Sequence, residues 1–338
     1  MIRPRLSVLL PVYNGQAFVS EAIDSVLSQT LEDFELLVLD DGSSDGSCAI
    51  CREWAARDRR VTFLRDEHRG LVARLNGGLS MAQGEFVARM DADDVALASR
   101  FEQQVQFLGL HPECVAVGSQ VALIDADGDM LTVKRLPLEH GGIDRQLMRG
   151  RGDIVCHPAA MFRKEAVLRI GGYREQFRHA EDLDLFLRLA EVGRLSNLPT
   201  VLLKYRQHLD SICHKMQDQQ QVSVLMAVRE AIRRRGLPVS LERRVMLPRR
   251  ASTEVCRSRW AQWALYSGRI GTARKHLLRL VASAPTRVRT YVLAGKAVLP
   301  TELAFGIART AIDALQDGAK RPEPRRGLCV TSSERVSP

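Results

Sequence analysis

Along the first 99 residues, short apolar runs alternate with segments in which apolar side chains recur at helical spacing. An apolar run closed by polar turn residues is typical of a buried strand, whereas a spacing of three to four residues is typical of an amphipathic helix. The pattern predicts strands at 6–10, 34–39, 61–64 and 86–90, and helices at 17–29, about 45–57 and about 70–82.

This alternation predicts a parallel sheet wound with helices on both faces. In such sheets ligands bind beyond the carboxyl ends of the strands. Three polar segments follow predicted strands directly, namely Pro11–Tyr13, Asp40–Asp41 and Asp91–Asp94. We therefore expect all three to meet at one edge of the sheet.

The next part of the chain predicts further elements of both kinds. A helix is expected at 101–110, strands at 114–124 and 129–135, a β-like segment at 154–162, a helix from 181 and a strand at 201–205.

Beyond residue 213 the pattern becomes helical, with arginine clusters at 233–235, 243–244 and 249–250. Trp263, Gly268, Ala273 and Pro285 resemble one helical hairpin of the tetratricopeptide type. We expect three parts: an α/β unit at 1–213, a basic helical region at 214–317 and a disordered tail at 318–338.

The composition, with 45% hydrophobic residues among 338, excludes a largely disordered, collagenous or coiled-coil protein. The N-terminal apolar stretch is too short for a signal peptide. The weakly polar run near 291–308 is interrupted by Lys296, Pro300 and Glu302, so it does not predict a plain membrane span. These features predict a cytoplasmic protein.

The net charge of +9 is unevenly distributed. Residues 215–338 hold 24 basic and 9 acidic side chains, a net +15, whereas residues 1–214 carry a net −6. We expect the basic region to hold the protein at the inner, anionic face of a membrane, the alternative being a helical cap with a solvated basic face. No nucleic-acid-binding motif accompanies the charge, so no nucleic-acid partner is expected.

Two acidic clusters differ in what they predict. Asp91, Asp93 and Asp94 follow a strand, and their mutual repulsion favours a hard cation such as Mg²⁺ or Mn²⁺ over the alternative of a solvated acidic turn. Residues 125–136 begin like a calcium loop but have Met130 and Leu136 where that loop needs Gly and Glu, so they predict a hairpin turn.

Two other carboxylate pairs have open interpretations. A carboxylate of Asp40–Asp41 suits a base N–H or a ribose hydroxyl, or else only a turn. Glu181 and Asp182 begin a helix, which fits either a plain cap or a positioned general base and its neighbour.

Several segments together resemble the bacterial-type family 2 glycosyltransferases, which have the GT-A fold. The resemblance implies a Rossmann-like mixed sheet wound with helices and covers residues 5–213. The segments occur in the family's order as SVLLPVYNG, AIDSVLSQT, FELLVLDDGSSDGS, LVARLNGGLSMAQGEFVARMDADD, HPAAMFRKEAVLRIGGYREQFRHAEDLDLFLRLAEVG and YRQHLDSIC.

The resemblance implies a nucleoside pocket in which Asp41 contacts the base. It leaves open which arginine lies near the nucleotide, because this chain has Leu75 before Asn76 where the family has arginine. It also implies a DxD pair with Asp93 as a direct metal ligand, His208 completing that site and Asp182 as catalytic base. The donor residues are Pro11, Tyr13, Asp41, Arg69 or Arg74, Asn76 and Asp91, and the acceptor-side residues are His157, Gly171, Gly172 and Glu181.

By the same resemblance, the protein is a metal-dependent, inverting enzyme of the hexosyltransferase type. It would move a sugar from a nucleotide-sugar donor, a UDP-sugar, to a hydroxyl of a glycan or lipid-linked acceptor. This reaction would serve cell-surface polysaccharide assembly. The alternative is a non-catalytic nucleotide-sugar-binding or scaffold protein of the same fold. A dinucleotide oxidoreductase is disfavoured because the first strand ends in PVYNG and not in a GxGxxG turn.

Overall fold

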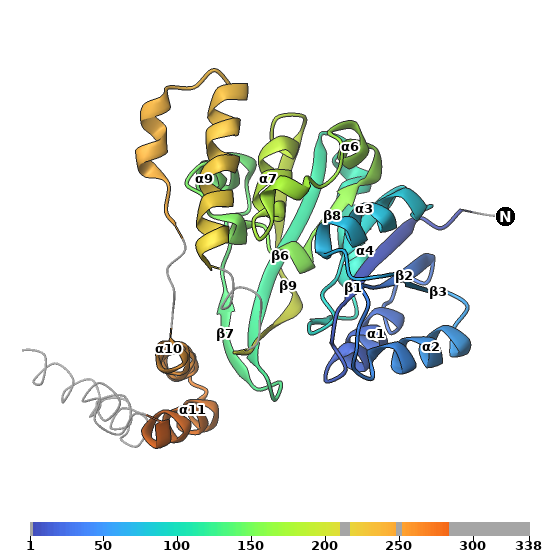
Figure 1. Ribbon diagram of the computed structural model, residues 1–338, viewed down its shortest axis with the longest axis vertical. Helices are drawn as coiled ribbons and strands as arrows, with labels where there is room; N and C mark the ends of the chain where they lie inside the picture. The colour runs from blue at the N-terminus through green and yellow to red at the C-terminus, as the bar shows by residue number, and fades with distance from the viewer. Residues whose placement is uncertain (1–2, 210–216, 248–251, 284–338) are drawn as a thin grey trace, which may run out of the picture.

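The computed structural model describes residues 3–209, 217–247 and 252–283. Its first half is a parallel sheet in the order β3-β2-β1-β4, with a helix crossing over between successive strands (Figure 1). The elements are β1 (Leu6–Val12), α1 (Val19–Leu27), β2 (Phe34–Asp40), α2 (Ser47–Arg57), β3 (Val61–Arg65), α3 (Leu71–Met81) and β4 (Phe86–Arg89).

The sheet continues beyond β4 with mixed direction. Strand β8 runs antiparallel to both β4 and β6, β9 runs parallel to β6, and β5 pairs with β9 at the edge. The predicted mixed sheet is therefore present. The elements are β5 (Val95–Ala96), α4 (Arg100–Leu110), β6 (Cys114–Asp125), β7 (Met130–Lys134), α5 (His140–Leu147), β8 (Met161–Arg163), α6 (Lys164–Arg169), α7 (Glu181–Leu189) and β9 (Arg194–Gln207).

Both faces of the sheet are covered by apolar side chains, because strand residues alternate between the faces. Val8 and Leu10 pack with the buried sides of α1 and α4, whereas Leu9 packs on the other face with α3, α5 and α7. This two-sided burial explains why β1 and β2 read as nearly continuous apolar runs.

The β-like segment predicted at 154–162 is wrong over most of its length. Two short 3₁₀ turns, Gly152–Ile154 and His157–Ala159, occupy it, and only β8 at its end is a strand. Pro158 lacks a donor N–H and suits a turn better than a central strand. The hairpin predicted near 125–129 is confirmed, since Asp125 N–H donates to the Asp129 carbonyl between β6 and β7.

The C-terminal helices pack against the α/β unit. Helix α9 (Gln217–Arg234) lies along α7, and the hairpin of α10 (Thr253–Tyr266) and α11 (Ile270–Ser283) lies beside β7 (Figure 1). Between α10 and α11, Gly268 has a positive φ of 72°, which suits the predicted helical hairpin. A further 3₁₀ turn covers Val239–Arg244.

Residues 249–250, Pro285 and the predicted tail at 318–338 lie outside the described residues, and the predicted division at 213 stays a prediction.

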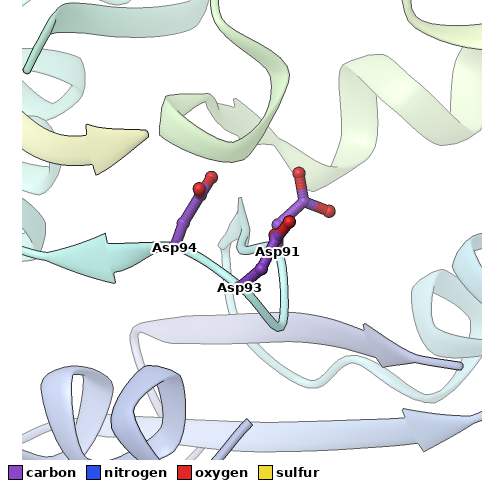
Figure 2. A group of neighbouring side chains, drawn as sticks. All are labelled: Asp91, Asp93 and Asp94. Carbon is purple, nitrogen blue, oxygen red and sulfur yellow. The ribbon is translucent and has the colours of Figure 1, made fainter. Parts of the chain in front are cut away.

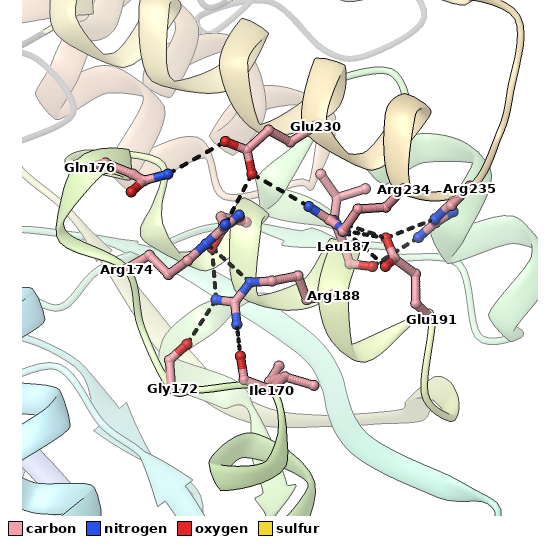
Figure 3. A network of polar contacts seen from close by, with 11 residues as sticks. Ile170, Gly172, Arg174, Gln176, Leu187, Arg188, Glu191, Glu230, Arg234 and Arg235 are labelled. Atoms are coloured by element: carbon pink, nitrogen blue, oxygen red, sulfur yellow. Dashed lines mark hydrogen bonds and ion pairs between the residues drawn. The ribbon is translucent and has the colours of Figure 1, made fainter.

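A polar network ties α7 to α9 (Figure 3). Asp184 is fully buried between Arg174 and Arg188, and Arg174 also pairs with Glu230 on α9 at 2.9 Å. Such a network fixes the orientation of α7, whose first residues are Glu181 and Asp182.

Candidate functional site

The ends of β1 and β2 form an aromatic and acidic corner. Tyr13 is 52% exposed and stacks on His68, with ring centroids 4.3 Å apart. Asp41 is buried beside them, and its two carboxylate oxygens accept the backbone N–H groups of Arg69 and Gly70 at 2.9 Å. An exposed aromatic face beside a fixed carboxylate suits a nucleoside base, because every base has a stacking face and N–H donors.

The two candidate arginines differ in their surroundings. Arg74 is buried and its guanidinium pairs with Asp66 and Asp41. Arg69 is exposed, and among the described residues no carboxylate pairs with it. Arg74 therefore links Asp41 to Asp66, and which of the two arginines lies near the nucleotide stays a prediction. Pro11 is buried within β1, opposite Leu39.

The side chain of Asn76 makes two hydrogen bonds to the backbone of Tyr173. Its Nδ2 donates to the Tyr173 carbonyl and its Oδ1 accepts the Tyr173 N–H, both at 2.9 Å. Gly172 has a φ of 67°, and a Cβ there would lie 2.7 Å from the Asn76 Oδ1, whereas Gly171, with a φ of 83°, has open space. Asn76 therefore positions the Gly171–Tyr173 turn, and its predicted place near the nucleotide stays a prediction.

The acidic loop after β4 gathers three carboxylates. One oxygen from each of Asp91, Asp93 and Asp94 lies within 4.8 Å of the others (Figure 2). Burial raises the pKa of Asp91, an increase that Arg89 partly offsets. Burial and the two neighbouring carboxylates raise the pKa of Asp94 well above its usual range. Asp94 is 1% exposed, and its Oδ2 has no hydrogen-bond partner in the described structure.

Basic groups surround this loop. His208 Nε2 lies 2.9 Å from Asp93 Oδ2, so the structure brings together the two residues predicted for one metal site. Arg89 is buried and pairs with Asp91. Arg206 donates through Nε to the Asp93 carbonyl at 2.7 Å. The remaining negative charge and the unpartnered Asp94 oxygen suit a hard divalent cation.

Glu181 and Asp182 stand at the N-terminus of α7. Burial, together with the neighbouring Asp182, raises the pKa of Glu181 to about 7. Burial also raises the pKa of Asp182, while the Leu183 N–H and the Arg89 guanidinium act to lower it. Gly152 makes room for Asp182, because a Cβ there would lie 3.3 Å from its Oδ1. A raised carboxylate pKa suits general-base work.

His157 lies deeper. Its Nε2 is 2.8 Å from the Tyr173 hydroxyl, and burial, followed by the nearby Arg89, lowers its pKa well below the usual range. A neutral, buried imidazole supports the Tyr173 turn and is poorly placed to contact an acceptor directly. The acceptor-side role of His157 stays a prediction.

Three residues of the site were missed by sequence reasoning: His68, Arg89 and Arg206. Arg89 is the last residue of β4 and precedes the acidic loop in sequence. Arg206 lies near the end of β9, far from that loop in sequence. Arg89 closes the apolar run FVAR, and a charged residue there indicates a buried partner, whereas Arg206 lies in the polar stretch KYRQ and gives no such signal.

Comparisons with known proteins agree with this geometry. The model of the family described as Glycosyl transferase family 2 matches residues 7–171. The putative glycosyltransferase EpsE of Bacillus subtilis is 34% identical over 242 residues, covering 70% of this chain and 85% of its own. The amylovoran biosynthesis glycosyltransferase AmsE of Erwinia amylovora is 34% identical over 210 residues, covering 61% and 77%.

Two solved structures share the fold. The mannosyltransferase PcManGT of Pyrobaculum calidifontis, in complex with GDP-Man and Mn²⁺, aligns with a TM-score of 0.53 and 22% identity, covering 94% of this chain and 88% of its own. S. aureus TarS 1–349, in complex with UDP-GlcNAc, aligns with a TM-score of 0.54 and 15% identity, covering 93% and 92%. The GT-A fold expected from the sequence is confirmed.

Proposed function

The chain belongs to glycosyl transferase family 2, and we propose that it transfers a hexose from a UDP-sugar, with inversion, to a hydroxyl of a glycan or lipid-linked acceptor. The observation that carries the proposal is the position of Arg89. This buried guanidinium pairs with Asp91 of the acidic loop and lies close enough to Glu181 and Asp182 for its charge to oppose the rise in both of their pKa values. Arg89 therefore supports a link between the proposed donor-side cluster and the helix start that carries the proposed base.

On the donor side, Asp91, Asp93, Asp94 and His208 would hold Mn²⁺ or Mg²⁺. The unpartnered, buried Asp94 oxygen supports this fit, since a buried carboxylate oxygen without a partner is costly. When bound, the ion supplies positive charge opposite the departing diphosphate. Tyr13 and Asp41 would bind the base, and the exposed Arg69 would reach the phosphates.

On the acceptor side, Asp182 would take the proton from the attacking hydroxyl. The new bond forms between that oxygen and the anomeric carbon as the bond from this carbon to the diphosphate oxygen breaks. Attack from the opposite face inverts the configuration, so one base suffices. Glu181, whose pKa is raised to about 7, would act as the neighbour of the base.

The biological role proposed is assembly of a cell-surface polysaccharide. Support comes from the relative AmsE, whose name refers to amylovoran biosynthesis. No helix among the described residues is both long enough and apolar enough to cross a membrane. We propose peripheral binding of residues 215–338 to an anionic membrane on its cytoplasmic side, supported by their net charge of +15.

The test is a screen of nucleotide sugars for donor hydrolysis and for a rise in melting temperature, with Mn²⁺ and with EDTA. We expect one UDP-sugar to be hydrolysed and to stabilise the protein only with Mn²⁺. Asp93→Asn should abolish both effects, whereas Asp24→Asn, an identical change on the exposed side of α1, should keep them. Hydrolysis that survives in Asp93→Asn, or no response to any donor, would contradict the proposal.

A further inference from the structure

A buried polar chain runs from the last described helix to the acidic loop. Its first member is Asp125, fully buried at the end of β6. The Asp125 carboxylate accepts from His276 Nε2 at 2.8 Å and lies 2.5 Å from Lys275 Nζ, both on α11. Its other oxygen accepts the N–H groups of Asp127 and Asp129, which holds the β6–β7 turn in shape.

The second member is Arg206 on β9, whose side chain is 2% exposed. Its Nη1 donates to the carbonyls of Asp125 and Ala126, and its Nε donates to the Asp93 carbonyl at 2.7 Å. The Arg206 backbone N–H donates to Asp94 Oδ1 at 2.8 Å. One residue therefore contacts the β6–β7 turn and two neighbouring residues of the acidic loop.

We propose that Arg206 is a positioning residue that fixes the acidic loop for metal binding, and that the α10–α11 hairpin supports it through Asp125. The inference rests on the proposed function, since it deepens the account of the same donor site. The guanidinium is a rigid planar fork with five donors, so it fixes the carbonyls it binds relative to one another. A lysine keeps the charge but cannot bridge both segments.

The hairpin is firmly seated on the α/β unit. Trp260, Ala264 and Ala273 belong to the same apolar core as β1 and α1, and the Trp260 ring packs edge-on against His276 at 5.4 Å. Ser267 adds a hydrogen bond to Thr132 of β7. A rigid support under Asp125 is the condition for Arg206 to hold the loop in one conformation before the ion binds.

The chain offers a matched control in Arg163. This guanidinium also bridges backbone carbonyls, those of Cys114, Leu108 and His111, but none of these belongs to the candidate site. Arg206→Lys and Arg163→Lys therefore remove the same kind of contact, and both should lower stability. Only Arg206→Lys should loosen the acidic loop.

The first experiment is hydrogen exchange by mass spectrometry on the full-length protein without ligands. We expect Arg206→Lys to raise exchange at residues 91–95 by about tenfold, and His276→Asn to raise it in the same direction by less. Arg163→Lys should leave this segment at the wild-type rate. Equal exchange at 91–95 in Arg206→Lys and the wild type would overturn the inference, whatever the protein's activity.

The second experiment is calorimetric titration of Mn²⁺ in the presence of UDP, and separately of GDP. Loss of a residue that orients metal ligands typically weakens metal affinity about 10–100-fold, which is the change expected for Arg206→Lys. Wild-type affinity in Arg206→Lys would overturn the positioning role while leaving the proposed function intact. A wild-type protein that takes no Mn²⁺ with either nucleotide overturns the proposed function, and the exchange result then still decides the role of Arg206.

Discussion

Replacing Asp182 with asparagine should separate catalysis from donor binding. Asparagine keeps the shape of the side chain, and its Oδ1 can still accept the Leu183 N–H, which Asp182 accepts at 2.7 Å. What it loses is the ability to take a proton. Loss of a general base typically lowers the rate by about 10²–10⁴. Donor affinity should be nearly unchanged, because the acidic loop follows β4 and not α7.

The pH dependence follows from the raised pKa of the base. Burial raises the pKa of Asp182, and burial and Asp182 bring the pKa of the neighbouring Glu181 to about 7. A raised pKa means that the proton is held up to a higher pH, so wild-type transfer should fall as Asp182 is protonated at a pH above the usual range of an aspartate. In Asp182→Asn the repulsion from a second carboxylate disappears, so the pKa of Glu181 falls. Residual activity carried by Glu181 should then persist to lower pH.

The assay is the initial rate of transfer across the neutral pH range, with donor affinity measured by calorimetry. Glu181→Gln is the control, because it removes the adjacent carboxylate about 100° around the helix. It should cost less activity and shift the acid limb of the wild-type profile. Asp182→Asn transferring at close to the wild-type rate, or a greater loss in Glu181→Gln, would refute the assignment and make Glu181 the base.

Four further outcomes are expected. Nucleoside diphosphate binding should require Mn²⁺ or Mg²⁺, and equal calorimetric affinity in EDTA would exclude the ion. Gly172→Ala should destabilise the protein by about 1–3 kcal/mol in thermal unfolding through a positive φ and a clash with Asn76, and more than Gly171→Ala, which has the φ alone. Asp184→Asn should cost about 3–5 kcal/mol in denaturant unfolding, because it leaves two paired arginines without their carboxylate; a loss below 1 kcal/mol would contradict this. Full-length protein should float with anionic vesicles at low salt and be released at high salt through residues 215–338, and failure to bind at low salt would rule this out.

The α/β half of the fold could be predicted because its strands are buried on both faces. Strands β1, β2 and β4 are almost wholly buried apolar runs, and amphipathic helices follow β1 and β2 directly. Strand β9 begins at Arg194, although only 201–205 was predicted, because its earlier part contains several polar residues and Pro199, which interrupts a strand pattern. Local pattern reveals burial on both faces more reliably than it reveals edges and turns.

The edge on which the site forms could also be predicted, since parallel strands end on one side. The partners at that edge could not. Asn76 meets Tyr173, 97 residues later, and Arg206 meets Asp93 from 113 residues away. Such contacts depend on how elements far apart in the sequence pack together, which no local periodicity encodes.

The basic region shows how a charge count can mislead. Arg234 and Arg235 contribute to the net charge of 215–338, yet both pair with Glu191, and Arg235 also pairs with Asp144. These arginines neutralise the carboxylates of Glu191 and Asp144 in the α/β unit. The attraction of this region to an anionic surface therefore depends on its other basic residues, and it should be weaker than +15 suggests.

The turn at 125–129 shows one way in which clustered carboxylates are compensated. Lys275 contacts all three aspartates of the turn, His276 contacts the buried one, and Arg279 contacts Asp127. Burial alone would raise the pKa of Asp125, but the hydrogen bonds from His276 and Lys275 hold it well below its usual range. The protein's own cations satisfy this cluster, so it needs no metal.

The acidic loop at 91–94 has the same crowding without the same compensation. Arg89 pairs with Asp91 and His208 with Asp93, but Asp94 receives only a backbone N–H. Burial and its neighbours raise the pKa of Asp94, the opposite direction to that of the compensated turn. The acidic loop therefore lacks a basic partner on the side of Asp94, and the proposed divalent cation, bound with its diphosphate, would supply positive charge there.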